Sequence, residues 1–120
     1  MKIAFTTSGK DLAAPLDRRF GRAAAFLVYD TDSRTFEVVD NLQNLNAAQG
    51  AGIQAAEAVA RTGAKAVVTG NCGPKAFRVL EAAGIKVYNA SAATIEEALV
   101  MYREGRLAEA AAANVEGHWM

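Results

Sequence analysis

Three arginines near the start of the chain are the first residues whose type and spacing suit a binding role. Arg18, Arg19 and Arg22 fall within five residues of one another. The planar guanidinium fork suits anions with several oxygen or sulfur atoms better than a single ammonium group does. Asp11 and Asp17 lie close by in the sequence, so a solvated loop with local ion pairs is an equally open interpretation.

A glycine turn, Gly50-Ala51-Gly52, precedes an apolar pattern of helical spacing. With Ala55 it matches a variant of the dinucleotide fingerprint, but no strand precedes it and no acidic residue follows about 20 positions later. What remains is a turn that presents free N–H groups at a helix start, where an anion is favoured. The alternative is that Gly50 and Gly52 serve only turn geometry and close packing.

The segment Gly70–Gly73 lies between an expected strand and the next helix. Ligands of open α/β sheets bind outside the carboxyl ends of the strands, and the glycines beside Asn71 and Cys72 allow a ligand to approach the backbone. Near a helix start Cys72 is expected to have some thiolate character, which suits a soft metal or a nucleophilic role. The other interpretation is a small buried residue with an inert thiol. Lys75 and Arg78 either add positive charge here or face solvent.

Motifs of several common enzyme classes are missing from the sequence. It contains no G-x-x-x-x-G-K-[ST] phosphate loop, no G-x-S-x-G elbow and no H-E-x-x-H pair. The first expected strand carries no acidic residue of the kind that a two-metal nuclease needs. The single histidine, His118, lies in the C-terminal tail and gives Cys72 no catalytic partner. We therefore expect a binding protein and not an enzyme.

The composition is that of an ordinary folded domain. Among 120 residues, 13 basic and 13 acidic side chains give a net charge of zero, which provides no overall attraction to nucleic acid or to an anionic membrane. One cysteine excludes an internal disulfide and fits a reducing compartment. No apolar run is long enough to span a bilayer, and the first residues are typical of a buried strand. These features predict a single domain over residues 1–120, cytoplasmic and monomeric, with no nucleic-acid or membrane partner.

The apolar pattern predicts five strands and three main helices. A polar turn joins two of the strands in a hairpin, Pro74 begins a helix, and Thr94 with Glu97 forms a capping box. Gly9–Ala23 has no sustained period and is expected to be a long flexible loop. The expected strands are 2–7, 25–30, 36–40, 66–69 and 85–88, and the helices begin near 53, 74 and 94, with a polar loop at 41–49, a short helix at 107–113 and a tail at 114–120.

This order of elements predicts an α/β fold with a mixed sheet. The hairpin makes the second strand antiparallel, whereas the later β-α-β units require parallel strands with right-handed crossovers. We expect a three-layer fold with a ribonuclease H-like topology, in which helices cover both faces of a five-stranded sheet.

Several segments of the chain resemble the dinitrogenase iron–molybdenum cofactor biosynthesis family. They are the opening MKIAF, the Arg19-Phe20-Gly21-Arg22 loop, the stretch GAGIQAAEAVARTGAKAVVTGNCGPKAF and Gly84–Tyr88, so the resemblance covers roughly residues 1 to 105. It implies a ribonuclease H-like fold without nuclease activity, a carrier or assembly role for a metal–sulfur cluster, and assembly partners that include ATPases of the Mrp/ParA type. Within the family the likeness is greatest to carriers of a molybdenum–copper sulfide cluster in sulfate-reducing bacteria.

The chain departs from the family pattern at one position. Nitrogenase cofactor carriers often have a histidine immediately before Phe-Gly, where this sequence has Arg19. This favours an anionic thiometallate held by charge, N–H groups and apolar contact, with Arg19 and Arg22 as the main charges. The iron–molybdenum cofactor or a precursor, and a metal-free docking module, are the alternatives. The residues expected to bind are Arg19, Phe20, Gly21, Arg22, Gly50, Gly52, Asn71, Cys72 and Gly73, with Cys72 as a possible metal ligand.

Overall fold

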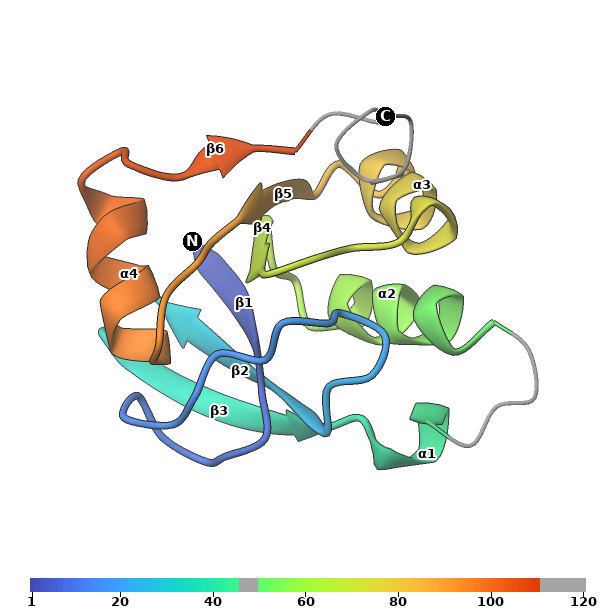
Figure 1. The fold of residues 1–120 in the computed structure, drawn as a ribbon, viewed down its shortest axis with the longest axis horizontal. Helices are drawn as coiled ribbons and strands as arrows, with labels where there is room; N and C mark the ends of the chain where they lie inside the picture. Colours follow the sequence, from blue (N-terminus) through green and yellow to red (C-terminus); the bar gives the residue numbers. More distant parts are fainter. Residues whose placement is uncertain (46–49, 111–120) are drawn as a thin grey trace.

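A mixed β-sheet flanked by helices forms the protein (Figure 1). The computed structural model describes residues 1–45 and 50–110. Along the chain the elements are β1 (Lys2–Thr7), β2 (Ala25–Asp30), β3 (Thr35–Asp40), α1 (Leu42–Leu45), α2 (Ala51–Arg61), β4 (Ala66–Thr69), α3 (Pro74–Ala82), β5 (Lys86–Asn89), α4 (Ile95–Arg103) and β6 (Ala108–Glu109).

The strands lie in the order β3-β2-β1-β4-β5-β6. β2 is antiparallel to both β1 and β3, whereas β4 is parallel to β1 and to β5. The predicted mixed sheet with an antiparallel second strand is therefore confirmed. β1 lies inside the sheet, and its residues after Lys2 are all buried, as the apolar run at the start of the chain requires.

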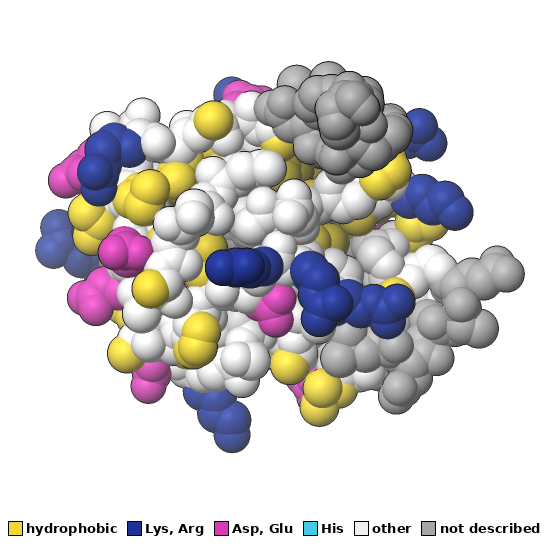
Figure 2. Space-filling view, in the orientation of Figure 1, with side chains coloured by type: hydrophobic (Ala, Val, Ile, Leu, Met, Phe, Trp, Pro, Cys, Tyr) yellow, Lys and Arg dark blue, Asp and Glu magenta, His cyan; other side chains and the backbone are white. Residues whose placement is uncertain are grey.

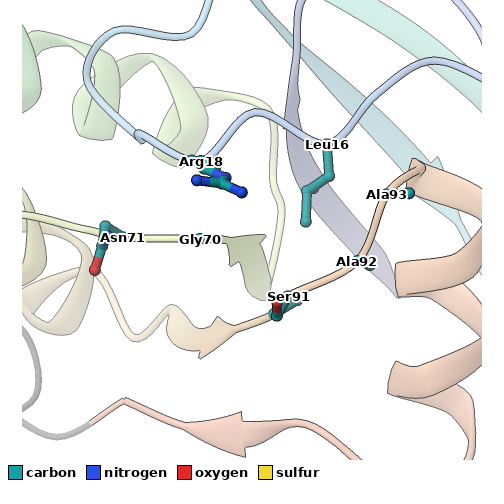
Figure 3. A pocket seen from close by; sticks show the side chains of 8 residues that line it. Leu16, Arg18, Gly70, Asn71, Ser91, Ala92 and Ala93 are labelled. Carbon is teal, nitrogen blue, oxygen red and sulfur yellow. The ribbon is translucent and has the colours of Figure 1, made fainter.

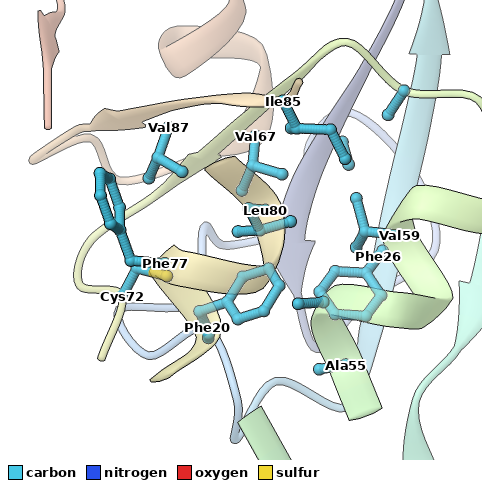
Figure 4. Close-up of a cluster of buried hydrophobic side chains, with 14 of the residues drawn as sticks. Phe20, Phe26, Ala55, Val59, Val67, Cys72, Phe77, Leu80, Ile85 and Val87 are labelled. Atoms are coloured by element: carbon cyan, nitrogen blue, oxygen red, sulfur yellow. The ribbon is translucent and has the colours of Figure 1, made fainter. Parts of the chain in front are cut away.

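Helices cover the two faces of the sheet and divide the core into two clusters. Val59 of α2 and Leu80 of α3 pack with Phe26 and Val67 on one face (Figure 4). On the other face, α4 contributes Ile95, Ala98 and Leu99 to a second cluster. Figure 1 shows α2 and α3 together on one side of the strands and α4 on the opposite side. The expected helices on both faces are thus confirmed.

Within residues 1–45 and 50–110 the sheet already has six strands, so the prediction of five is wrong. β6 pairs with the edge of β5 through Asn89 with Ala108 and Tyr88 with Glu109, and the Ala110 N–H donates to the Val87 carbonyl at 2.7 Å. The short helix expected at 107–113 is absent at Ala108–Glu109, because the open edge of β5 offers backbone partners that outweigh the helical preference of alanine. Residues 111–113 and the tail at 114–120 lie outside the described residues.

A four-residue helix, α1, lies within the segment expected to be a polar loop. The Asp40 carboxylate accepts a hydrogen bond from the Leu42 N–H at 2.7 Å and holds the start of this turn. Asn41 is fully buried and donates its side-chain amide to the Ala23 carbonyl at 2.8 Å. The Asn41 side chain thus links two segments of the chain through a buried hydrogen bond.

Helix α4 begins close to the predicted cap. The Thr94 hydroxyl accepts from the Glu97 N–H at 3.2 Å, as a capping box requires. The Glu97 carboxylate accepts from the Ala93 N–H at 2.7 Å, one residue before the position expected for the return bond. The cap is therefore confirmed at Thr94, and its second half is shifted by one residue.

Candidate functional site

The loop over residues 9–23 contains no helix or strand, yet hydrogen bonds fix its path over the carboxyl end of β1. The Thr6 hydroxyl donates to the Asp17 carbonyl at 2.8 Å, and the Thr7 hydroxyl donates to the Pro15 carbonyl at 2.8 Å. These bonds place the arginines that follow at the edge of the sheet where β1 and β4 end.

Phe20 anchors the same loop in the core. Its side chain is 1% exposed, and its ring lies 5.3 Å from that of Phe26, centroid to centroid (Figure 4). The Phe20 N–H also donates to the Asn71 carbonyl at 2.9 Å. Phe20 was predicted as a binding residue, and in the structure it holds its neighbours Arg19, Gly21 and Arg22 at the surface.

Two close backbone contacts join the loop to the other predicted motifs. A Cβ atom on Gly70 would lie 2.7 Å from the Arg18 carbonyl oxygen, and one on Gly21 would lie 3.0 Å from the Gly52 Cα atom. Only glycine permits such approaches. The structure therefore brings together the arginine loop, the start of α2 and the turn before α3.

A pocket of about 430 Å³ opens where these three segments meet. We call it the helix-start pocket, because the first residues of both α2 and α3 form its walls. Gly21 and Arg22 of the loop complete it. Its lining residues are Gly21, Arg22, Gly50, Ala51, Gly52, Ile53, Gly73, Pro74, Lys75 and Ala76.

The free N–H groups in this pocket follow from how each helix is capped. At α4 the Ile95 and Glu96 N–H groups donate to the carbonyls of Ala14 and Leu12. At α2 and α3, the N–H groups of residues 51–53, 75 and 76 have no acceptor within residues 1–45 and 50–110. Two helix starts, with their positive dipole ends and with N–H groups that find no acceptor among the described residues, therefore line one pocket.

The arginines near this pocket are exposed, and local acids do not neutralise them. In the part of the chain that the structure describes, Arg18, Arg19 and Arg22 form no ion pair. The nearby carboxylates are engaged by backbone: Asp17 accepts from the Arg19 N–H at 2.9 Å, and Asp11 accepts from the Ala13 N–H at 3.0 Å. Figure 2 shows Lys and Arg side chains in a row across this face. The ion pairs with Asp11 and Asp17 that the alternative interpretation expected are not seen among the described residues.

Cys72 does not have the thiolate character that its sequence position predicted. Its side chain is 2% exposed and belongs to the apolar cluster with Phe20, Phe77 and Leu80 (Figure 4). Burial raises the pKa of the Cys72 thiol to about 12. Desolvation disfavours the thiolate, so the structure supports the inert-thiol interpretation.

The described residues supply no ready set of metal ligands here. Within the described ranges, no three side chains among histidine, cysteine, aspartate and glutamate lie close enough to hold a metal ion. Gly73 lines the helix-start pocket, whereas Asn71 is exposed and lines a second pocket together with Arg18, so the structure does not bring Asn71 to the same pocket as Gly73. What the described residues offer at the helix-start pocket is positive charge and N–H donors.

Arg19 is exposed and lines neither of the two pockets. In the sequence it stands between Arg18, which lines a second pocket together with Ala90–Ala93, and Gly21, which lines the helix-start pocket. Ala90–Ala93, which follows the carboxyl end of β5, was not among the predicted site residues. The rule that located Gly70–Gly73 at a strand end applies equally there. Lys75, weighed as a source of charge, does line the helix-start pocket.

Comparison with known proteins identifies the family. The model of the dinitrogenase iron–molybdenum cofactor family matches residues 1–105. The chain belongs to this family. An uncharacterised protein of Methanocaldococcus jannaschii is 31% identical over 104 residues, which cover 80% of this chain and 87% of the relative.

Two solved structures are similar to this chain in sequence and in fold. The apo form of the orange protein from Desulfovibrio gigas is 42% identical, with a TM-score of 0.89 over 92% of each chain. A NifB-like protein from Thermotoga is 38% identical, with a TM-score of 0.79, and the match covers 90% of this chain and 91% of that one. Among the described residues, no helix has the length and apolar character needed to cross a membrane.

Proposed function

We propose that this protein carries an anionic metal–sulfur cluster and holds it non-covalently at the helix-start pocket. The observation that carries the proposal is the convergence of two helix starts and the Arg22 and Lys75 side chains on one pocket of about 430 Å³. Unused N–H donors and positive charges stabilise an anion. Membership of the dinitrogenase iron–molybdenum cofactor family supports a metal–sulfur cluster as that anion.

A molybdenum–copper sulfide cluster is the cargo that this site suits best. Such a cluster carries its own sulfide ligands, which fits a site without a set of protein metal ligands in the described ranges. Similarity to the orange protein supports the same choice. Arg19, which stands where a ligating histidine occurs in nitrogenase cofactor carriers, favours contact by charge. The iron–molybdenum cofactor or a precursor is therefore the second candidate, on the strength of the family match.

Arg19 and Arg22 supply the main charges, and Gly50, Gly52 and Gly73 let the cluster approach the backbone. Cys72 is not assigned a bond to the metal, because its thiol is buried among apolar side chains. The strand order with its antiparallel second strand supports the ribonuclease H-like assignment as part of this proposal. Assembly ATPases of the Mrp/ParA type are the proposed partners in cluster delivery.

Charge removal tests the proposed site. The double variant Arg19→Ala/Arg22→Ala is mixed with tetrathiomolybdate and copper, desalted and analysed for metal. We expect it to retain at least about ten-fold less metal than the wild type, since two charge-assisted contacts are lost. The matched control, Arg34→Ala/Arg61→Ala, removes two exposed arginines of the hairpin turn and the far end of α2 and should load normally.

Equal metal retention by both double variants would refute binding by charge at this site. A wild-type protein that retains no molybdenum, copper or iron–molybdenum cofactor would instead favour the metal-free docking module. Rapid alkylation of Cys72 in the folded protein at neutral pH would instead support a different function, that of a small enzyme with a cysteine nucleophile.

A further inference from the structure

A second pocket, of about 530 Å³, lies at the edge of the sheet where three strands end. We call it the strand-end pocket. Leu16 and Arg18 follow β1, Gly70 and Asn71 follow β4, and Ala90–Ala93 follows β5. Its size falls within the range of roughly 300–1,000 Å³ that is typical of small-ligand sites.

The strand-end pocket results from the directions in which the connections after β4 and β5 leave the sheet. The chain leaves β4 towards α3 on one face of the sheet, and it leaves neighbouring β5 towards α4 on the opposite face. The two connections diverge and leave a crevice between the strand ends. In open α/β sheets such a switch point is where ligands bind.

The groups that line the strand-end pocket favour a compact anion. Arg18 is exposed and lines the pocket from the loop, and Figure 3 shows it beside Gly70. Among the described residues no acidic side chain lines the pocket. Ser91 lines it from the segment after β5, and in the described part of the chain the Ser91 and Ala92 N–H groups have no acceptor. One guanidinium, one hydroxyl and two N–H groups match the oxygens of a tetrahedral oxyanion.

We infer that the strand-end pocket binds a phosphate group, either free or as part of a small phosphate monoester. The small side chains of Ala90, Ala92 and Ala93 leave room for the ester portion beside the phosphate. This inference is independent of the cluster site, because the pockets share no lining residue. The hydrogen bond from the Phe20 N–H to the Asn71 carbonyl ties the loop down at the edge of the strand-end pocket.

The test is titration of the full chain with inorganic phosphate, AMP and adenosine at low ionic strength, followed by calorimetry and by backbone amide NMR. We expect phosphate and AMP to bind and adenosine not to bind. The amide signals of Gly70, Ser91 and Ala92 should shift, whereas those of Gly52 and Lys75 should not. Tighter binding of AMP would identify a monoester as the ligand, and equal binding would identify the phosphate group alone.

Two variants locate the site. Arg18→Ala should weaken phosphate binding by at least about ten-fold, the effect of losing one charge-assisted contact. Ala92→Glu, which places a carboxylate in the pocket, should abolish binding, and Arg61→Ala should leave it unchanged. Absence of phosphate binding at millimolar concentration, shifts confined to the helix-start pocket, or unchanged binding by Arg18→Ala would each overturn the inference.

Discussion

At the scale of single residues, burial decides what the chemistry-bearing side chains do. Cys72 and Phe20 lie beside the site in sequence, and both point into the core. Arg18, Arg19 and Arg22 are exposed, and Asp17 accepts a hydrogen bond from the Arg19 N–H. Residue type and spacing identified this cationic segment as a candidate. They did not predict the state of Cys72, because the competition between a helix start and an apolar surrounding depends on packing.

The buried thiol predicts a pH dependence of stability. In the unfolded chain Cys72 loses its proton near its ordinary pKa of 9.0, whereas in the folded protein burial raises the pKa to about 12. The folded state then binds more protons, so this contribution to stability is complete below pH 9 and is lost as the pH rises towards 12. The wild type should lose roughly 1 kcal/mol more unfolding free energy than Cys72→Ala between pH 8 and pH 10.

Urea unfolding of both proteins at each pH measures this difference. The Cys72→Ala variant controls for the lysines and tyrosines that titrate in the same range. Parallel stability curves for the two proteins from pH 8 to pH 10 would mean that the thiol is not desolvated.

Replacing Phe20, a single residue of an irregular loop, is expected to cause a large loss of stability. Phe20→Ala removes a fully buried ring that packs on Phe26 and should cost about 3–5 kcal/mol in unfolding free energy. Phe36→Ala, on the 40% exposed Phe36 of β3, is the matched control and should cost less than about 1 kcal/mol. Similar costs measured by urea unfolding would show that the loop is not anchored through Phe20.

At the scale of elements, most strands and helices could be predicted because their apolar periods, caps and turns are local. β2, β4, α3 and the start of α4 follow from these signals. β6 could not be predicted, since the alanine-rich segment around it favours a helix and only the open edge of β5 makes a strand. α1 was missed because the hydrogen bond at its start is accepted by Asp40, which the sequence pattern assigned to a strand.

Gly70 and Gly73 lie in the same turn, and we expect them to differ in how well they tolerate substitution by alanine. Gly70→Ala would place a Cβ atom 2.7 Å from the Arg18 carbonyl oxygen and must displace the loop, at a cost of about 1–3 kcal/mol. A Cβ atom on Gly73 would meet nothing within 4 Å, so Gly73→Ala should cost less than about 1 kcal/mol. Urea unfolding compares them, and equal stabilities would contradict the close contact between the loop and the end of β4.

At the scale of the whole molecule, binding depends on where charges gather, because the net charge is zero. The arginine loop, the start of α2 and the turn before α3 are separated by tens of residues and meet at one pocket. Each motif was visible in the sequence as a candidate. Their convergence depends on the packing of α2 against α3 and on the Gly21–Gly52 contact, which no local pattern encodes.

The most direct test of cluster binding is reconstitution of the wild-type protein. Metal-free protein is mixed with tetrathiomolybdate and copper, desalted, and examined by visible spectroscopy and elemental analysis. We predict molybdenum and copper retained in a fixed ratio, with sulfide-to-metal charge-transfer bands. A colourless eluate free of both metals would contradict the proposal that the helix-start pocket carries a molybdenum–copper sulfide cluster.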